Sequence, residues 1–86
     1  MYEIRSAEKA RENFKSLPLR IQVRVQDVFD RLTRWPNVSG VKPLRGPLKG
    51  AYRIRTGDWR VLFTVDVPAG RVTVFRIDNR RDVYQD

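Results

Sequence analysis

The chain contains no cysteine and no histidine. The absence of cysteine excludes a disulfide scaffold, a thiol nucleophile and a zinc site built on thiolates. The absence of histidine removes the commonest general base and the commonest metal ligand of proteins. Any chemistry must therefore come from arginine, lysine, tyrosine, carboxylate or hydroxyl side chains, and we expect neither a metal nor another cofactor.

Long apolar runs are missing as well. No run approaches the roughly 20 residues needed to cross a bilayer, and the start, MYEIRSAEK, lacks the apolar segment of a signal peptide. The chain has 86 residues, of which 41% are hydrophobic, and this is enough for one compact core. These features predict a single cytoplasmic domain over residues 1–86 that has no membrane partner.

Positive charge is in excess. Eighteen basic residues against ten acidic ones give a formal net charge of +8. Fourteen of the eighteen are arginine, whose planar fork of N–H groups binds phosphate through two parallel hydrogen bonds. The excess is concentrated in residues 42–81, which hold ten basic and three acidic residues. This distribution favours an anionic partner, and nucleic acid in particular.

Apolar spacing and turn residues predict six elements in the order strand, helix, helix, strand, strand, strand. Their expected ranges are 2–5, 7–16, Pro18 to Trp35-Pro36, 52–55, 58–65 and 71–77. Ser6 is the expected N-cap of the first helix, and residues 36–50, with three prolines and three glycines, are expected to form a loop. The order is typical of an α+β fold, in which a helical hairpin covers one face of a small, largely antiparallel, four-stranded sheet.

A two-residue turn at Thr56-Gly57 is expected to join the first two strands of the hairpin region and to set their register. In this register Arg53 faces Arg60 on the side of the sheet opposite the helices. Arg55 faces Asp58, which offsets its charge. The core face is expected to carry five apolar side chains: Tyr52, Ile54, Trp59, Val61 and Phe63.

For the last strand, the register that keeps the core face apolar sets Arg60 against Arg76. Its core-face pairs are Trp59–Ile77 and Val61–Phe75. Arginines from three adjacent strands then converge on the solvent face, with Leu62 and Val74 as an apolar floor. Five further basic residues are expected to extend this patch: Lys42, Arg45, Lys49, Arg80 and Arg81.

Two interpretations of this basic patch stand side by side. Basic side chains on strands are often solvated residues that prevent edge-to-edge pairing. A cluster of like charges, however, lowers stability unless an anion binds to it, and phosphate is the obvious anion.

The stretch VKPLRGPLKGAYRIRTGDWRVLFTV, followed by VTVFRIDNRRDVY, resembles the RelE/ParE superfamily of toxins from toxin–antitoxin systems. The resemblance covers almost the whole chain. It implies a small toxin that an acidic antitoxin neutralises. The RelE branch of the family cuts messenger RNA in the ribosome, whereas the ParE branch inhibits DNA gyrase.

The resemblance also implies roles for individual residues. Arg53 and Arg55 occupy positions at which RelE-like enzymes place basic catalytic residues, and Arg60 matches the arginine that holds the scissile phosphate. In the C-terminal element, Arg80 or Arg81 matches a second arginine that contacts phosphate. The same element ends in Tyr84, which matches a tyrosine close to the chemistry.

The chain departs from the family pattern in two places. Many relatives have glycine, histidine and arginine where this chain has Asp78-Asn79-Arg80, and some have lysine in place of Arg53 and Arg55. The cations needed to stabilise a phosphorane are therefore present, whereas arginine cannot act as a base at neutral pH. Proton transfer is left to Tyr84, with Lys49 in reserve, although Tyr84 could equally be a residue that only covers the sheet edge.

Three functions therefore follow from the resemblance and the basic patch. The first is an endoribonuclease that cleaves ribosome-bound messenger RNA by attack of the ribose 2′-hydroxyl. The second is a ParE-like toxin that inhibits DNA gyrase by binding and performs no chemistry. The third is a module of the same fold that binds its antitoxin but has lost toxicity.

Overall fold

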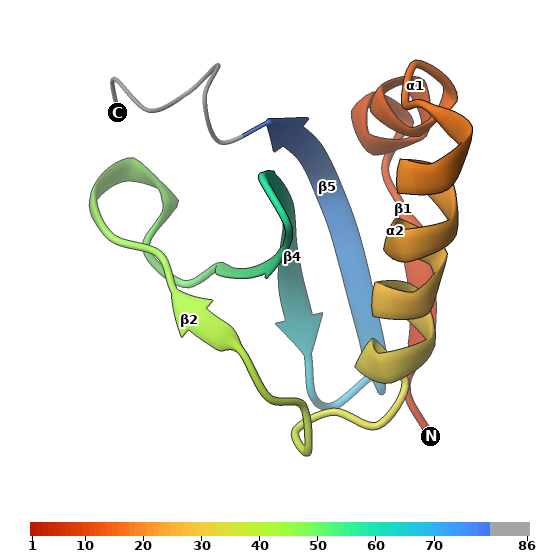
Figure 1. Cartoon of the computed structure of the whole chain (residues 1–86). Coiled ribbons are helices and arrows are strands. Elements are labelled where there is room, and N and C mark those ends of the chain that lie inside the picture. Colours follow the sequence, from red (N-terminus) through yellow and green to blue (C-terminus); the bar gives the residue numbers. More distant parts are fainter. Residues whose placement is uncertain (80–86) are drawn as a thin grey trace.

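The protein is described by a computed structural model over residues 1–79. Two helices pack on one face of a five-stranded sheet, in the order β-α-α-β-β-β-β (Figure 1). The elements are β1 (Glu3–Ser6), α1 (Glu8–Lys15), α2 (Leu19–Leu32), β2 (Val41–Pro43), the 3-10 turn η1 (Gly46–Leu48), β3 (Tyr52–Thr56), β4 (Trp59–Asp66) and β5 (Arg71–Asn79). The predicted α+β architecture is confirmed. Neither helix within residues 1–79 is long and apolar enough to span a membrane.

The sheet has the strand order β1-β5-β4-β3-β2, in which only β1 and β5 run parallel. It contains one strand more than the sequence predicts, because β2 lies in the segment expected to be a loop. Pro43 in this strand lacks an N–H group, and such a residue is tolerated on an edge strand. The neighbouring prolines and glycines hide so short a strand from any pattern in the sequence.

Both helices form where they were predicted, but α2 ends at Leu32, before Trp35-Pro36, and the start of α1 differs from the prediction. Ser6 belongs to β1, and Ala7 takes the N-cap position without a side-chain hydrogen bond, so the prediction of Ser6 as the cap is wrong. Pro18 directly precedes α2, where its missing N–H group costs no hydrogen bond. The rings of Phe14 and Phe29 stack at 6.3 Å between centroids and join the two helices.

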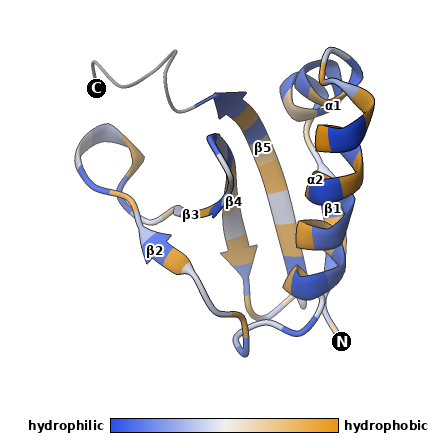
Figure 2. Ribbon diagram, viewed as in Figure 1, coloured by the Kyte–Doolittle hydropathy of each residue, from blue (hydrophilic) through white to orange (hydrophobic). Residues whose placement is uncertain are grey.

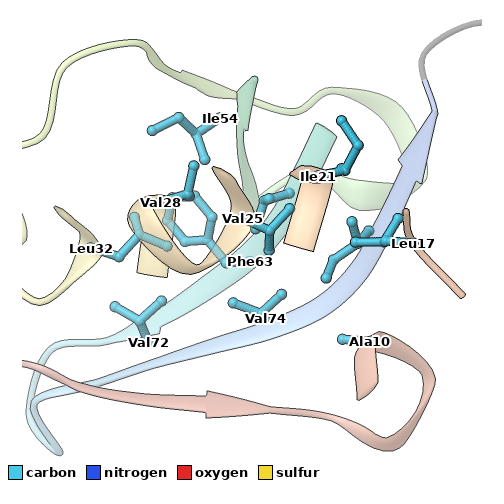
Figure 3. Packing of buried hydrophobic residues seen from close by; sticks show 12 residues of the cluster. Ala10, Leu17, Ile21, Val25, Val28, Leu32, Ile54, Phe63, Val72 and Val74 are labelled. Atoms are coloured by element: carbon cyan, nitrogen blue, oxygen red, sulfur yellow. The ribbon is translucent and has the colours of Figure 1, made fainter. Parts of the chain in front are cut away.

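The core lies between α2 and the inner face of the sheet (Figure 3). The buried residues of α2 recur at helical spacing: Ile21, Val25, Val28 and Leu32. They meet the strand residues Ile54, Phe63 and Val74, which are almost completely buried. Figure 2 shows the corresponding alternation of hydrophobic and hydrophilic bands along α2 and β5.

The turn between β3 and β4 lies one residue later than predicted. Gly57 and Asp58 form the loop, and the strands pair as Arg55 with Arg60 and Ile54 with Val61. A type II′ turn needs a positive φ at its first loop position, and Gly57 supplies it with φ +64°, whereas Thr56 would be strained there. The pairing is displaced by two residues, and an even displacement leaves every side chain on its predicted face.

The predicted register of β4 with β5 is wrong in two ways: the pairs up to Leu62 are displaced by two residues, and a β-bulge between Leu62 and Phe63 changes the displacement to one residue beyond it. Arg60 pairs with Asp78 instead of Arg76, and Leu62 pairs with Arg76. The remaining pairs relevant to the core are Val61–Ile77 and Phe63–Val74. Val74 is therefore a buried core residue and not part of an outer floor, while Phe75 stays outside the core cluster.

Replacing Phe63 by alanine should lower the free energy of unfolding by about 3–5 kcal/mol, because its fully buried ring leaves a cavity that neighbouring side chains cannot fill. Chemical denaturation measures this loss. Val67→Ala is the control, since Val67 is 64% exposed. Its substitution should change stability by less than about 0.5 kcal/mol. Equal losses for both variants would contradict the position assigned to Phe63.

Candidate nucleic-acid interface

The outer face of the sheet, opposite the helices, carries two rows of mainly basic side chains. The strand pairing sets one row across β2, β3, β4 and β5: Lys42, Arg53, Leu62 and Arg76. It sets a second row across β3, β4 and β5: Arg55, Arg60 and Asp78. We call these seven residues the basic face. Its five cations and one carboxylate leave a formal charge of +4.

The rest of the outer face, around β1 and the start of β5, is electrically balanced. Glu3 Oε1 lies 3.0 Å from Arg71 Nε and 3.4 Å from Arg5 Nε. The hydrogen bond from Arg71 and the charge of Arg5 hold the pKa of Glu3 below its usual value of 4.5. Asp66 pairs across the ladder with Arg71. On the outer face, the excess positive charge therefore lies on β2, β3, the start of β4 and the end of β5.

Arg60 and Arg76 come together on the basic face. The carboxylate of Asp78, which was not part of the predicted basic patch, lies between them. Asp78 accepts two hydrogen bonds from Arg60, at 3.0 Å from Nε and 3.2 Å from a terminal nitrogen. The same carboxylate lies 3.0 Å from Nε of Arg76. The side chains of Arg60 and Asp78 are 16% and 11% exposed, so this contact is well shielded from water.

A groove of about 560 Å³ opens above Arg60 and Arg76. Leu62, which is fully buried, belongs to its lining, as do apolar residues of the segment around η1. The complete lining is Leu44, Arg45, Pro47, Leu48, Arg60, Leu62 and Arg76. Three guanidinium groups thus surround an apolar surface, an arrangement that suits a sugar–phosphate backbone with an attached base.

A second hollow, of about 240 Å³, lies on the β2 side of the basic face. It is lined by Gly40, Lys42, Arg53 and Arg55. Lys42 and Arg53 are direct neighbours across the β2–β3 ladder. Since Arg55 also pairs with Arg60, the two hollows are joined by adjacent basic side chains. The basic face can therefore hold a polyanion over more than one phosphate.

The structure brings together six of the ten basic or aromatic residues predicted for the site: Lys42, Arg45, Arg53, Arg55, Arg60 and Arg76. Lys49 follows η1 and lines neither hollow. Arg80, Arg81 and Tyr84 lie outside the described residues. Asp58 lies in the turn between β3 and β4 and not opposite Arg55, as the predicted register had placed it.

Sequence analysis missed Asp78 and the apolar wall around η1. The signal for Asp78 was present, because residues two apart on a strand share a face and Arg76 precedes it by two. The prediction ended this strand at residue 77, one residue too early to use that signal. No pattern identifies the wall, since its residues lie in a segment rich in proline and glycine.

Comparison with known proteins identifies the family. Residues 4–84 match the family described as ParE toxin of type II toxin–antitoxin system, parDE. Toxin RelG of Mycobacterium tuberculosis is 36% identical over 85 residues, which cover 98% of this chain and 97% of that protein. The chain belongs to the RelE/ParE family of type II toxin–antitoxin toxins. The family resemblance predicted from the sequence is thereby confirmed.

Two further relatives support a RelE-like toxin. Toxin RelE of Mycobacterium tuberculosis is 33% identical over 85 residues, covering 98% of this chain and 87% of that protein. The toxin–antitoxin complex RelBE2 from the same organism contains a chain with a TM-score of 0.82 and 35% identity, covering 92% of this chain and 91% of that chain. This protein is therefore a RelE-like toxin of a type II toxin–antitoxin system.

Removing two charges from the basic face should weaken binding to a polyanion more than removing two charges from α2. We expect a Lys42→Gln, Arg55→Gln double variant to bind single-stranded RNA more weakly. The slope of log K against log[NaCl] should become shallower by roughly 0.7 for each phosphate that the variant no longer neutralises. Fluorescence anisotropy over a range of NaCl concentrations measures both effects. An Arg20→Gln, Arg24→Gln double variant is the control of equal net charge, and equal weakening by the two variants would contradict an RNA-binding role of the basic face.

Glu3 should contribute to stability only above acidic pH. Because its pKa is lower in the folded than in the unfolded state, its contribution is complete above pH 4.5 and is lost as the pH falls through the folded value. We expect Glu3→Gln to lower the melting temperature at pH 7, and this difference to shrink as the pH falls below 4.5. Thermal unfolding followed by circular dichroism over a series of acidic pH values tests this, and a difference that does not shrink would show that the pairs with Arg5 and Arg71 are not its cause.

Proposed function

We propose that this toxin is an endoribonuclease that cleaves ribosome-associated messenger RNA. The observation that carries the proposal is the groove in which Arg60, Arg76 and Arg45 surround an apolar surface. Preorganised donors directed at developing charge are usually the largest contribution to catalysis of this kind. The similarity to the RelG and RelE toxins over almost the full chain supports the same conclusion.

In the proposed reaction the ribose 2′-oxygen attacks the adjacent phosphorus, and the bond to the 5′-oxygen of the next nucleotide breaks. The 2′-hydroxyl loses its proton, the 5′-oxygen gains one, and a cyclic phosphate remains. Arg60, with Arg53 or Arg80, stabilises the phosphorane. Tyr84 is the proposed donor or acceptor of the proton.

The remaining basic residues are proposed to hold the RNA backbone through charge-assisted hydrogen bonds. They are Lys42, Arg45, Lys49, Arg55, Arg76 and Arg81. Their contacts to phosphate position the RNA and carry no sequence information by themselves. Because the proposed substrate is bound to ribosomes, we also propose that the toxin acts in the cytoplasm.

We further propose that an acidic antitoxin covers the basic face. The relative in the RelBE2 structure is part of a toxin–antitoxin complex. An acidic chain would neutralise the formal charge of +4 on the basic face, and the attraction would make association fast and dependent on salt. The interface is expected to reach at least the roughly 1,600 Å² of a standard complex.

Inhibition of DNA gyrase by binding alone is the second candidate function. It is favoured by the family match, which carries the ParE description. It is also favoured by the groove itself, because none of its described lining residues is a lysine, tyrosine or glutamate that could transfer a proton. The third candidate, a module that binds its antitoxin but is not toxic, has the same features.

Replacing Arg60 by alanine should reduce RNA cleavage by about 10²–10³-fold, because the phosphorane loses its main cationic donor. Induction of the variant in cells should no longer arrest growth, and primer extension on cellular transcripts should lose the cleavage stops. Arg34→Ala is the control, since Arg34 is exposed after α2 and its replacement removes the same charge. This control variant should remain toxic.

Different results select between the candidates. Growth arrest by the wild-type chain with induction of the DNA-damage response and intact transcripts would reject the nuclease and support gyrase inhibition. Absence of growth arrest by a folded wild-type chain that binds its antitoxin would support the third candidate.

A further inference from the structure

Asp78 is the single carboxylate among the seven residues of the basic face, and the proposed reaction gives it no role. Its side chain is 11% exposed. It binds Arg60 through two hydrogen bonds and Arg76 through one contact of 3.0 Å. A shielded carboxylate between two arginines that line the same groove requires an explanation beyond surface solubility.

We propose that Asp78 is a positioning residue that holds Arg60 and Arg76 as a preformed pair of cations for one phosphodiester. This inference rests on the proposed nuclease function, because it concerns the groove in which the RNA would bind. Asp78 would not contact the RNA. It would act through the two arginines.

The strand pairing fixes the relative positions of Arg60, Arg76 and Asp78. Asp78 on β5 lies directly opposite Arg60 on β4. Two positions along each strand, Arg76 lies opposite Leu62. Arg76 and Asp78 lie on the outer face on either side of Ile77, whose side chain lies in the core, as the alternation along β5 requires. Groups held by strands are placed more accurately than groups held by loops.

The hydrogen bonds to Asp78 orient the guanidinium groups. A guanidinium carries five N–H groups, and the pair with Asp78 accounts for two of those on Arg60. Arg76 contacts Asp78 through Nε. A carboxylate bound in this way restricts the rotation of a long side chain and so fixes the direction of its planar guanidinium group.

The charges also balance. Two arginines and one carboxylate carry a formal charge of +1, so one phosphodiester with charge −1 makes the group neutral. Without the carboxylate, the two guanidinium groups would repel each other, and both would have to be ordered again to reach the phosphorane. Positioning them beforehand lowers the barrier of the chemical step.

The simpler explanation is that Asp78 only joins β4 to β5. The two explanations differ in what happens when the charge is removed but the shape is kept. If Asp78 positions the arginines, Asp78→Asn adds net positive charge to the groove and should bind RNA more tightly, yet it should cleave more slowly. If Asp78 only joins strands, the active fraction falls while kcat per folded molecule stays the same.

The test uses the full chain and purified ribosomes carrying a defined messenger RNA. For Asp78→Asn we expect kcat to fall by about 10²-fold, as for small displacements of catalytic groups. We expect KM to fall as well, because the groove gains positive charge. Asp66→Asn is the control: it makes the same charge change on the outer face at the balanced end of the sheet. It should leave kcat and KM unchanged.

Asp78→Glu provides the second variant. It restores the charge, so KM should return to the wild-type value, while kcat should recover only in part because the carboxylate is displaced by one methylene group. This variant also replaces Asp78→Asn if the latter does not fold. A kcat within threefold of wild type for either folded variant, or a loss of kcat in Asp78→Asn without any fall in KM, would overturn the proposal.

RNA binding separates this inference from the proposed function. If the wild-type chain cleaves no RNA, the nuclease proposal fails, but the binding of a single-stranded RNA oligonucleotide still tests the placement of charge. Asp78→Asn should then steepen the slope of log K against log[NaCl] by roughly 0.7, the value for one additional neutralised phosphate. An unchanged salt dependence, or an equal change in Asp66→Asn, would show that Asp78 does not control the cations of the groove.

Discussion

The pairing of β4 with β5 determines both faces of the sheet. A β-bulge places Val74 and Ile77 in the core although they are three positions apart, so the strand between them does not follow simple alternation. On the side of the bulge that includes Ile77, regular alternation places Arg76 and Asp78 on the outer face. Because a slip of one residue would exchange the faces, the apolar core and the charged groove are stabilised by the same set of backbone hydrogen bonds.

The distribution of carboxylates gives the two ends of the outer face different properties. Near β1, Glu3 and Asp66 balance the neighbouring arginines. On the basic face a single carboxylate is shared between Arg60 and Arg76. A fold this small tolerates the remaining charge because the fully buried residues on the other side of the sheet supply its stability. The surface for a polyanion and the core thus share one sheet without sharing side chains.

Most of the fold and part of the site could be predicted from the sequence. Helical spacing identified the buried stripe of α2, and alternation placed Arg53, Arg55 and Arg60 on the outer face. The register of neither hairpin was predicted correctly. For β3 and β4 the error was harmless, since a displacement of two residues preserves the faces. For β4 and β5 the pairs of Arg60 and Val61 were also displaced by two residues, but beyond Leu62 a bulge adds one residue and brings Val74 into the core, and no composition signal marks where a bulge occurs.

By itself the sequence determined the charge, the order of the elements and the side of the sheet on which most arginines lie, because these depend on composition and on local periodicity. Only the tertiary structure decided that Arg60 faces Asp78, that Val74 is buried and that the segment around η1 forms a wall of the groove. These contacts join residues that are distant along the chain. Their geometry depends on the bulge and on the packing of whole strands, which no local pattern of residues records.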